Sequence, residues 1–358
     1  MAETWITLGP SSLPILGDLI NVGVKGVRLT FSFGTPQLQE DRAKLIKVAA
    51  DRVGTTCLAI ADLPGEKVRI GHFDGAETIE VTAGEEFEIA VSEREKPSVS
   101  RRIPLPHAKF VASLSVGDCL VIGDGSAVAT IESVNDGRVI ARARQQGVIN
   151  QTRGVTLQGG SFVPSCLTET DLDNLAFIGR STAFDMVALS FVSTPSDVET
   201  ARSILAGEGC FVPIIAKIET SAGLRNLHDI CSVSDLVMAA RGDLALAIPW
   251  IELPEAVESI ACSAIDTRTP WILATQVAEG LERFAFPTRA EISDLAHWLK
   301  RGCAAVMLSY ETVFGRNAAG AVECTDAMIR HYRDLDGLAP DGLYTLAMRI
   351  RESAPVRD

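Results

Sequence analysis

The sequence lacks long apolar runs and an N-terminal targeting segment. No apolar stretch approaches the roughly 20 residues that span a bilayer, and the first residues, MAETWITLGP, contain no basic region followed by an apolar block. A membrane partner and a secretory route are therefore not expected. We place the protein in the cytoplasm.

Paired cysteines and clustered histidines are also missing. The eight cysteines occur singly without a CxxC pair, and the five histidines form no HxxxH or HExxH spacing. Dispersed cysteines in a chain of this size indicate small buried side chains in a reducing compartment. The histidine spacing excludes the usual zinc motifs, so we expect no zinc site.

Positive charge is scarce, whereas apolar residues are plentiful. The formal net charge of -13 at pH 7 argues against nucleic acid as a partner, because that binding needs a basic face. The 358 residues are 47% hydrophobic and 22% charged, which is ordinary for a folded chain. This length allows one large core and a smaller domain.

Short β-branched runs recur along the chain, and most are separated by one segment of helix length. This alternation predicts βα units and a parallel sheet. Eight such units favour a closed (β/α)8 TIM barrel over an open sheet. The expected strands are 4–10, 26–32, 56–63, 184–192, 212–219, 234–242, 270–277 and 304–311, and helices are expected at 37–53, 195–208, 252–267 and 288–302.

The alternation breaks once, between the third and fourth strands. Residues 72–153 contain short alternating runs separated by AGE, GDG and NDG turns, which predict a small all-β domain inserted between strand 3 and helix 3. An insertion on this end of a barrel is well placed to act as a lid. We expect the barrel at 1–71 and 154–334, and a C-terminal tail at 335–358 with a short helix near 342–352.

Polar residues gather where the expected strands end, which is where barrels of this kind carry their chemistry. Lys217 and Glu219 interrupt an otherwise apolar strand two positions apart, so they share one face. A structural ion pair would explain one such strand end, but not five strands that each end in an ionisable group. The strand-end polar residues are Arg28, Thr30, Ser32, Asp62, Lys217, Glu219, Arg241, Asp243, Thr275, Ser309 and Glu311.

The types of these residues indicate a divalent metal and an anionic substrate. Glu219 and Asp243 follow adjacent strands, and Mg²⁺ typically takes one or two protein carboxylates. Neighbouring arginine and lysine side chains suit a phosphate or carboxylate, and the turn MAARGDLA offers backbone N–H groups to a carboxylate where a helix begins. The residues alone therefore predict a magnesium enzyme acting on a small anion.

At these positions the sequence resembles the pyruvate kinase family. The matching motifs occur in one order across nearly the whole chain, and together they are highly specific. The motifs are TLGPSS (7–12), GVRLTFSFG (26–34), ADLPGEKVRIG (61–71), GVTLQGG (154–160), LTETD (167–171), ALSFV (188–192), IIAKIET (214–220), MAARGDLALAIP (238–249), ILATQVAEGL (272–281), FPTRAEISDLA (286–296) and VMLSYET (306–312).

The resemblance implies that phosphoenolpyruvate and ADP react to give pyruvate and ATP. By this resemblance Lys217 neutralises the transferred phosphoryl group and the enolate oxygen, Arg28 grips the phosphate, and Thr275 belongs to the network that protonates the enolate. Glu219 and Asp243 would hold the catalytic Mg²⁺ or Mn²⁺. The resemblance also implies that the substrate carboxylate binds the backbone of Ala240, Arg241, Gly242 and Asp243. The nucleotide phosphates would bind Arg69 and Arg153.

The resemblance also predicts activity without potassium. Family members that need no K⁺ have leucine and lysine where this chain has Leu63 and Lys67. The Lys67 ammonium would then stand in for the monovalent cation near Asp62, Ser32 and Thr30.

The sequence departs from the family mainly on the nucleotide side and around the mouth of the barrel, which leaves the phosphoryl acceptor open. The departures are Thr30, Phe33, Thr152, Arg153, Ala245, Ala247 and Tyr310. The family's C-terminal regulatory domain is also absent from this sequence. We therefore expect no allosteric control through that domain, and a homodimer formed through the barrel.

Three other functions remain open at this point. The chain could be a relative that keeps the enolpyruvate site but uses another acceptor in a specialised pathway. It could carry out enolate chemistry without phosphoryl transfer. A non-catalytic binding paralogue is the third, although a binding role would not require Lys217, Glu219, Asp243, Thr275 and Arg28 to be present together.

Overall fold

The computed structural model describes residues 2–96, 101–135 and 138–336, and positions 343, 347, 348 and 350. The chain divides into two compact units. The barrel unit comprises 1–65, 165–241 and 254–358, and the second unit comprises 66–164 and 242–253. No helix in the described ranges combines the length and apolar character needed to cross a membrane.

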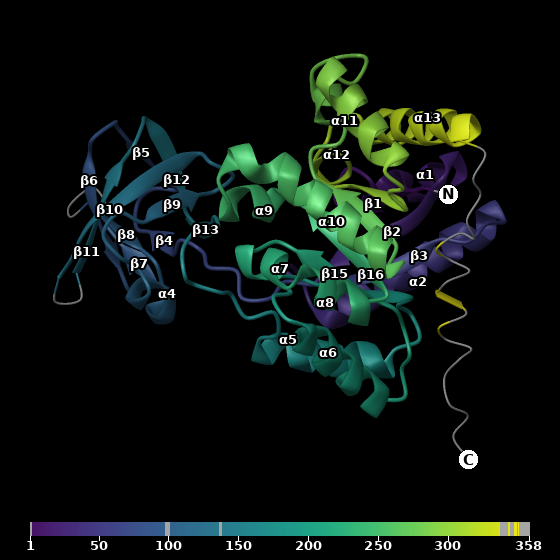
Figure 1. Cartoon of the computed structure of the whole chain (residues 1–358), viewed down its shortest axis with the longest axis horizontal. Helices are drawn as coiled ribbons and strands as arrows, with labels where there is room; N and C mark the ends of the chain where they lie inside the picture. The colour runs from purple at the N-terminus through teal and green to yellow at the C-terminus, as the bar shows by residue number, and fades with distance from the viewer. Residues whose placement is uncertain are drawn as a thin grey trace. The chain divides into compact units, whose positions relative to one another are not determined.

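The barrel unit contains a closed barrel of eight parallel strands, as predicted (Figure 1). Most strands are shorter than the apolar runs suggested, and Arg28, Asp62 and Lys217 lie within strands rather than after them. Around the barrel they are ordered β1 (Glu3–Thr7), β2 (Val24–Thr30), β3 (Leu58–Leu63), β14 (Met186–Leu189), β15 (Ile214–Ile218), β16 (Leu236–Ala240), β17 (Trp271–Ala274) and β18 (Ala305–Leu308).

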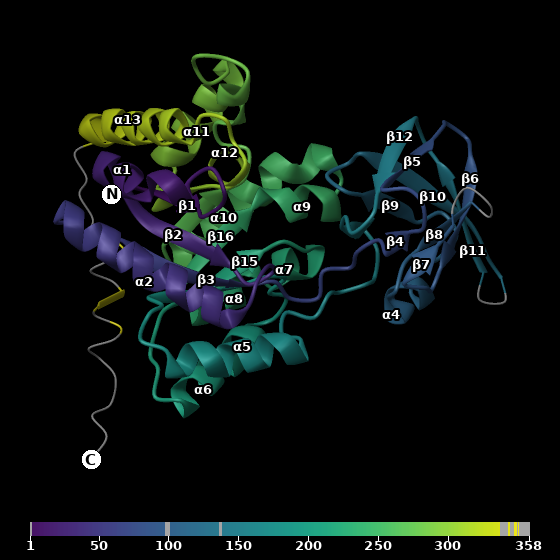
Figure 2. The same ribbon diagram turned by 180° about the vertical axis from the view of Figure 1, so that it is seen from behind.

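Helices surround these strands, as Figures 1 and 2 show from opposite sides. Two of the family-like motifs start helices, because Thr168 with Asp171 and Thr288 with Glu291 form reciprocal capping boxes. The helices and 3-10 turns are η1 (Leu13–Ile15), α1 (Leu16–Val22), α2 (Pro36–Val53), α5 (Glu169–Arg180), α6 (Pro195–Gly207), α7 (Ser221–Arg225), α8 (Leu227–Val233), α10 (Leu253–Thr267), η3 (Glu279–Glu282), α11 (Arg289–Lys300), α12 (Tyr310–Val313) and α13 (Ala318–Asp336).

The interior of the barrel is filled by alternate residues of its strands. Trp5 packs against the backbone of Gly26, where a Cβ atom would lie 2.8 Å from the indole ring. Only glycine leaves room for this ring in the layer. Other members of the interior cluster are Leu58, Ile60, Met186, Ala188, Ile215, Leu236, Met238, Ala240, Ile272, Ala274, Ala305 and Met307.

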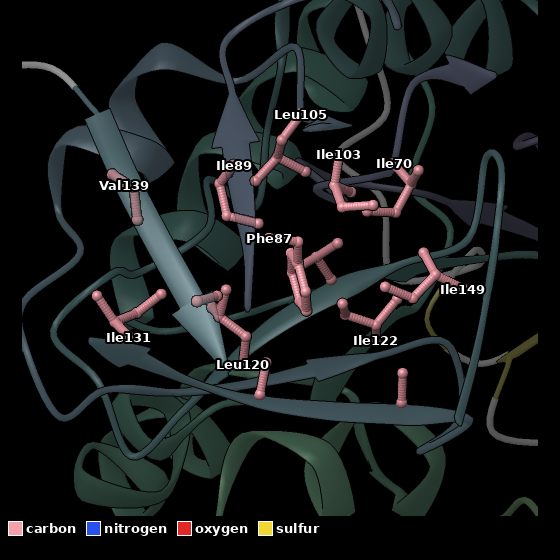
Figure 3. Packing of buried hydrophobic residues seen from close by; sticks show 14 of the residues in the cluster. Ile70, Phe87, Ile89, Ile103, Leu105, Leu120, Ile122, Ile131, Val139 and Ile149 are labelled. Carbon is pink, nitrogen blue, oxygen red and sulfur yellow. The ribbon is translucent and has the colours of Figure 1, made fainter. Parts of the chain in front are cut away.

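The second unit is built mainly of antiparallel strands around its own apolar core (Figure 3). Among its described residues is also a short helix, α4 (Ala108–Ala112), which the alternating pattern did not predict. Its main sheet has the order β13 (Val155–Gln158), β9 (Cys119–Ile122), β10 (Ala127–Asn135), β11 (Arg138–Ala143), β6 (Glu86–Ala90) and β8 (Arg102–Pro104), and its two-stranded sheets pair β12 (Gly147–Asn150) with β5 (Thr78–Val81) and β4 (His72–Phe73) with β7 (Arg94–Glu95).

A separate stretch of chain, 242–253, belongs to this second unit. It contains most of α9 (Arg241–Ala247) and the turn η2 (Trp250–Glu252). The backbone N–H of Gly159 donates to the carbonyl of Ala247 at 2.9 Å, and Gln158 Nε2 donates to the carbonyl of Ile248 at 3.0 Å. No motif or periodicity predicted this attachment.

The cysteines are all free, and most are buried. Burial raises the pKa of Cys57, Cys231 and Cys303 to about 12, so these thiols stay protonated. Cys262 is exposed, which corrects the expectation of uniformly buried cysteines. The helix predicted near 342–352 lies largely outside the described residues.

Candidate functional site

A polar layer continues the rows of side chains that fill the barrel. Asp62, Ser190 and Lys217 each follow an inward-facing apolar residue by two positions, counted from Ile60, Ala188 and Ile215. Because side chains repeat their direction every second residue of a strand, these three face the same interior. The strand register therefore gathers polar groups from β3, β14 and β15 above the apolar layers.

Lys217 lies at the centre of this layer and is only 5% exposed. Its Nζ atom lies 3.1 Å from Asp62 Oδ1, 3.2 Å from Glu219 Oε1 and 2.8 Å from Ser190 Oγ. Burial lowers the pKa of this ammonium, but the carboxylates of Asp62 and Glu219 outweigh burial and raise that pKa above its ordinary value. The result is a fixed buried positive charge.

Asp62 joins Lys217 to a second cation. Arg28 Nε lies 3.0 Å and Nη2 2.9 Å from Asp62 Oδ2, and Arg28 Nη1 donates to Thr7 Oγ1 at 3.4 Å. Burial raises the pKa of the Asp62 carboxyl, but Arg28 and Lys217 outweigh it and hold that pKa below its ordinary value. Arg28, Lys217, Asp62 and Glu219 thus form one largely buried cluster in which two cations and two carboxylates balance in formal charge.

Ser190 is a site residue that the sequence analysis did not single out. Its hydroxyl donates to the carbonyl of Leu63 at 2.6 Å and accepts from Lys217 Nζ. The hydroxyl thereby links the ammonium to the end of β3. Its position within ALSFV, two residues after a barrel-interior alanine, was the signal that could have identified it.

Glu219 joins Lys217 to the backbone that follows β14. Its Oε2 accepts the backbone N–H of Phe191 at 2.8 Å, and its Oε1 contacts Lys217. Carboxylate oxygens are ligands that a hard cation such as Mg²⁺ prefers.

Three of the residues predicted around the monovalent-cation position meet within the barrel unit. Thr30 and Asp62 are partners in the register of β2 and β3, and the carbonyl of Asp62 accepts the N–H of Phe31 at 2.9 Å. The N–H of Ser32 donates to Thr30 Oγ1 at 3.3 Å. The fourth residue, Lys67, belongs to the second unit.

Thr275 follows the end of β17, and the side chain of Arg241 contacts its backbone. Arg241 Nη2 donates to the carbonyl of Thr275 at 2.6 Å, so this guanidinium is engaged in the protein rather than free for a ligand. Ala240 and Ala274 are register partners at the ends of β16 and β17. The implied carboxylate contact of residues 240–243 therefore rests on their backbone.

The second unit holds its own group of predicted residues. Lys67 Nζ lies 2.9 and 3.1 Å from the two carboxylate oxygens of Asp243. Arg69 Nη1 donates to the carbonyl of Thr152 at 3.1 Å, and the carbonyl of Arg153 accepts from the neighbouring strand segment. Lys67, Arg69, Arg153, Gly242 and Asp243 are thus all in this unit.

Comparison with known proteins gives one consistent family. Residues 2–322 match the family described as "Pyruvate kinase, barrel domain". Curated relatives named pyruvate kinase include those of Corynebacterium efficiens, 33% identical over 94% of this chain and 70% of the relative, and of Mycobacterium tuberculosis, 31% identical over 93% and 70%. A crystal structure of pyruvate kinase from Pyrobaculum aerophilum matches with a TM-score of 0.82 and 26% identity, over 92% of this chain and 73% of the other.

Proposed function

Because the chain belongs to the pyruvate kinase family, we propose that it transfers the phosphoryl group of phosphoenolpyruvate to ADP, giving pyruvate and ATP. The observation that carries this proposal is the buried Lys217 ammonium, kept charged by Asp62 and Glu219. A permanent charge in a water-poor site stabilises negative charge that develops during a reaction far better than the same charge in water.

The proposed reaction requires positioning and fixed positive charge more than covalent participation. The P–O bond of the enol phosphate breaks, and a new P–O bond forms to the terminal phosphate oxygen of ADP. Lys217 offsets the charge on the phosphoryl oxygens and on the enolate oxygen left behind, and Arg28 holds the phosphate. The enolate carbon then takes a proton through the network that contains Thr275.

We propose Glu219 and Asp243 as ligands of the Mg²⁺ or Mn²⁺ ion. When bound, the ion supplies further positive charge to the substrate's phosphate and carboxylate oxygens. The buried Glu219 carboxylate, an oxygen ligand of the kind that Mg²⁺ prefers, supports its role. Asp243 is paired with Lys67, which would orient its carboxylate.

Removing the Glu219 carboxylate should weaken divalent-metal binding. For Glu219→Ala we expect a loss of roughly tenfold or more in affinity, because even residues that only orient ligands contribute about 10-fold to 100-fold. Isothermal titration calorimetry with Mn²⁺ or Mg²⁺ measures this affinity directly. Glu208→Ala, which removes an exposed partner of Arg180, is the control and should bind metal normally; an equal affinity for both variants would remove Glu219 from the ligand set.

Activity should not depend on potassium. If the Lys67 ammonium replaces the monovalent cation, turnover in sodium buffer should equal turnover in potassium buffer of the same ionic strength. The comparison needs coupling enzymes that have been checked with added pyruvate in both buffers. A strong potassium requirement would contradict this role of Lys67.

A coupled assay of pyruvate formation tests the proposed reaction. It combines phosphoenolpyruvate and Mg²⁺, with and without ADP, in potassium-free buffer. Pyruvate that forms only with ADP would support the proposal. Binding of phosphoenolpyruvate without pyruvate formation would favour a relative that uses another acceptor, and pyruvate formation without nucleotide would favour enolate chemistry alone.

We also propose a cytoplasmic location and a homodimer formed through the barrel. The dispersed free cysteines support the location. Light scattering coupled to size-exclusion chromatography measures the mass of the assembly, and a mass equal to one chain would exclude the dimer.

A further inference from the structure

Thr275 and Gln276 adopt a backbone conformation that their side chains disfavour. Their φ angles are +74° and +54°, in the left-handed region where a β-branched residue is a genuine outlier. Such conformations persist only when the surrounding structure holds them. The contacts around these two residues therefore need an explanation.

Arg241 holds the carbonyl groups of this segment. Its Nε donates to the carbonyls of Ala274 at 3.3 Å and Thr275 at 3.1 Å. Its Nη2 donates to the carbonyls of Thr275 at 2.6 Å and Gln276 at 3.1 Å. Three successive carbonyls thus converge on one guanidinium, whose Nη1 pairs with Asp294.

Glu311 holds the N–H groups that come next. Its Oε1 accepts from the backbone of Val277 and of Ala278, both at 3.0 Å, and its Oε2 accepts from the backbone of Ser309 at 2.9 Å. The residue is 1% exposed. Burying a carboxylate is unfavourable unless such bonds are formed, and bonds to an ionised acceptor are the strong ones.

We infer that Arg241 and Glu311 act as a clamp that fixes Thr275 in its left-handed conformation, and that Glu311 is a positioning residue for Thr275. The cation binds the carbonyls of 274–276 and the anion binds the N–H groups of 277 and 278, so reorienting a peptide in this segment breaks charged hydrogen bonds. The inference rests on the proposed role of Thr275 in protonating the enolate. It assigns a function to a buried carboxylate that the proposed reaction does not otherwise use.

A purely structural role for Glu311 predicts a different outcome. Its bond to the Ser309 N–H holds the start of the four-residue helix α12, and loss of this bond alone would lower stability without changing the chemical step. Positioning of Thr275 instead predicts a lower kcat with an unchanged KM for phosphoenolpyruvate, because the groups that hold the substrate remain in place.

The test compares Glu311→Gln with two matched variants. Glutamine keeps the size of the side chain but replaces one acceptor oxygen by a donor, so it cannot satisfy all three N–H groups. Glu311→Asp keeps the charge and should restore part of the activity. Glu291→Gln alters another carboxylate that accepts backbone N–H groups, at the start of α11, and should lower the thermal midpoint while leaving kcat unchanged.

Two measurements are made on each variant. Amide hydrogen exchange by mass spectrometry reports whether residues 275–278 are still held, and it does not depend on the reaction. Steady-state kinetics reports the effect on kcat and on the KM for phosphoenolpyruvate. For Glu311→Gln we expect faster exchange in this segment and a kcat lower by roughly 100-fold, the effect of a misplacement of about 1 Å in a reacting group.

The outcomes separate this inference from the proposed function. Unchanged exchange, or faster exchange with unchanged kcat, would overturn the inference. If the wild type does not convert phosphoenolpyruvate, the proposed function fails, and the exchange comparison alone decides whether Glu311 holds the segment. Should Glu311→Gln not fold, Glu311→Asp is measured in its place, with faster exchange and a partly lowered kcat expected; wild-type exchange or wild-type kcat in that variant would overturn the inference.

Discussion

Replacing Lys217 by methionine is expected to reduce turnover by roughly a thousandfold or more, since removal of one preorganised donor to a developing anion already has an effect of about 10²–10³. Methionine matches the length of the lysine stem but cannot carry the charge that Asp62 and Glu219 maintain. Divalent-metal binding should persist, because the Glu219 carboxylate remains.

Three measurements make the Lys217→Met result specific. Turnover, Mn²⁺ or Mg²⁺ affinity and the thermal midpoint are compared with those of Lys44→Met, which removes an exposed lysine paired with Glu40 and should leave turnover unchanged. Some loss of stability is expected for Lys217→Met, because two buried carboxylates lose a partner. A folded variant with a rate near that of the wild type would exclude Lys217 from the mechanism.

Replacing Asp62 by asparagine is expected to lower the free energy of unfolding of the barrel unit by about 3–5 kcal/mol, the usual effect of removing one member of a buried ion pair. Asp62 contacts both Arg28 and Lys217. Asparagine leaves these two cations close together without the carboxylate between them. Urea denaturation followed by the fluorescence of Trp5 and Trp271, which are buried in the barrel unit, measures the change.

The directions of the two pKa shifts predict how the stabilisation by Asp62 and Lys217 depends on pH. Because the folded-state pKa of Asp62 is lowered, its stabilising contribution is fully present above about pH 4 and is lost as pH falls through the folded-state value. For Lys217 the pKa is raised, so its contribution is present below about pH 10 and is lost at higher pH.

The difference in free energy of unfolding between wild type and Asp62→Asn should therefore be constant near neutral pH and should decrease in acid. Asp74→Asn, in a surface pair with Arg94, is the control and should change stability by less than about 1 kcal/mol. An Asp62→Asn variant as stable as this control would contradict the buried network.

Much of the barrel was predictable because its signals are local. A β-branched run and the helix-length segment after it lie within one short stretch of chain, and capping residues such as Thr288 and Glu291 mark a helix start directly. The polar layer was also predictable in part. Lys217 and Asp62 interrupt apolar strands, and a charge in such a place needs a partner.

The contacts that complete the site were not predictable in the same way. Ser190 is an ordinary residue in sequence, and its role appears only when β14 is placed between β3 and β15. The positive φ of Thr275 was not predictable, because the residue at this position is not a glycine. Glu311 lies 36 positions from Thr275 in the chain, and Lys67 lies 176 positions from Asp243, so no periodicity connects them.

The attachment of 242–253 to the second unit affects how the two units could be separated by engineering. The chain passes between them at four places, after residues 65, 164, 241 and 253. Deleting 66–164 as a cassette would remove Lys67, Gln158 and Gly159, which hold Asp243, Ala247 and Ile248. A barrel trimmed of the β-rich segment would therefore retain Asp243 in sequence but lose the residues that orient this carboxylate.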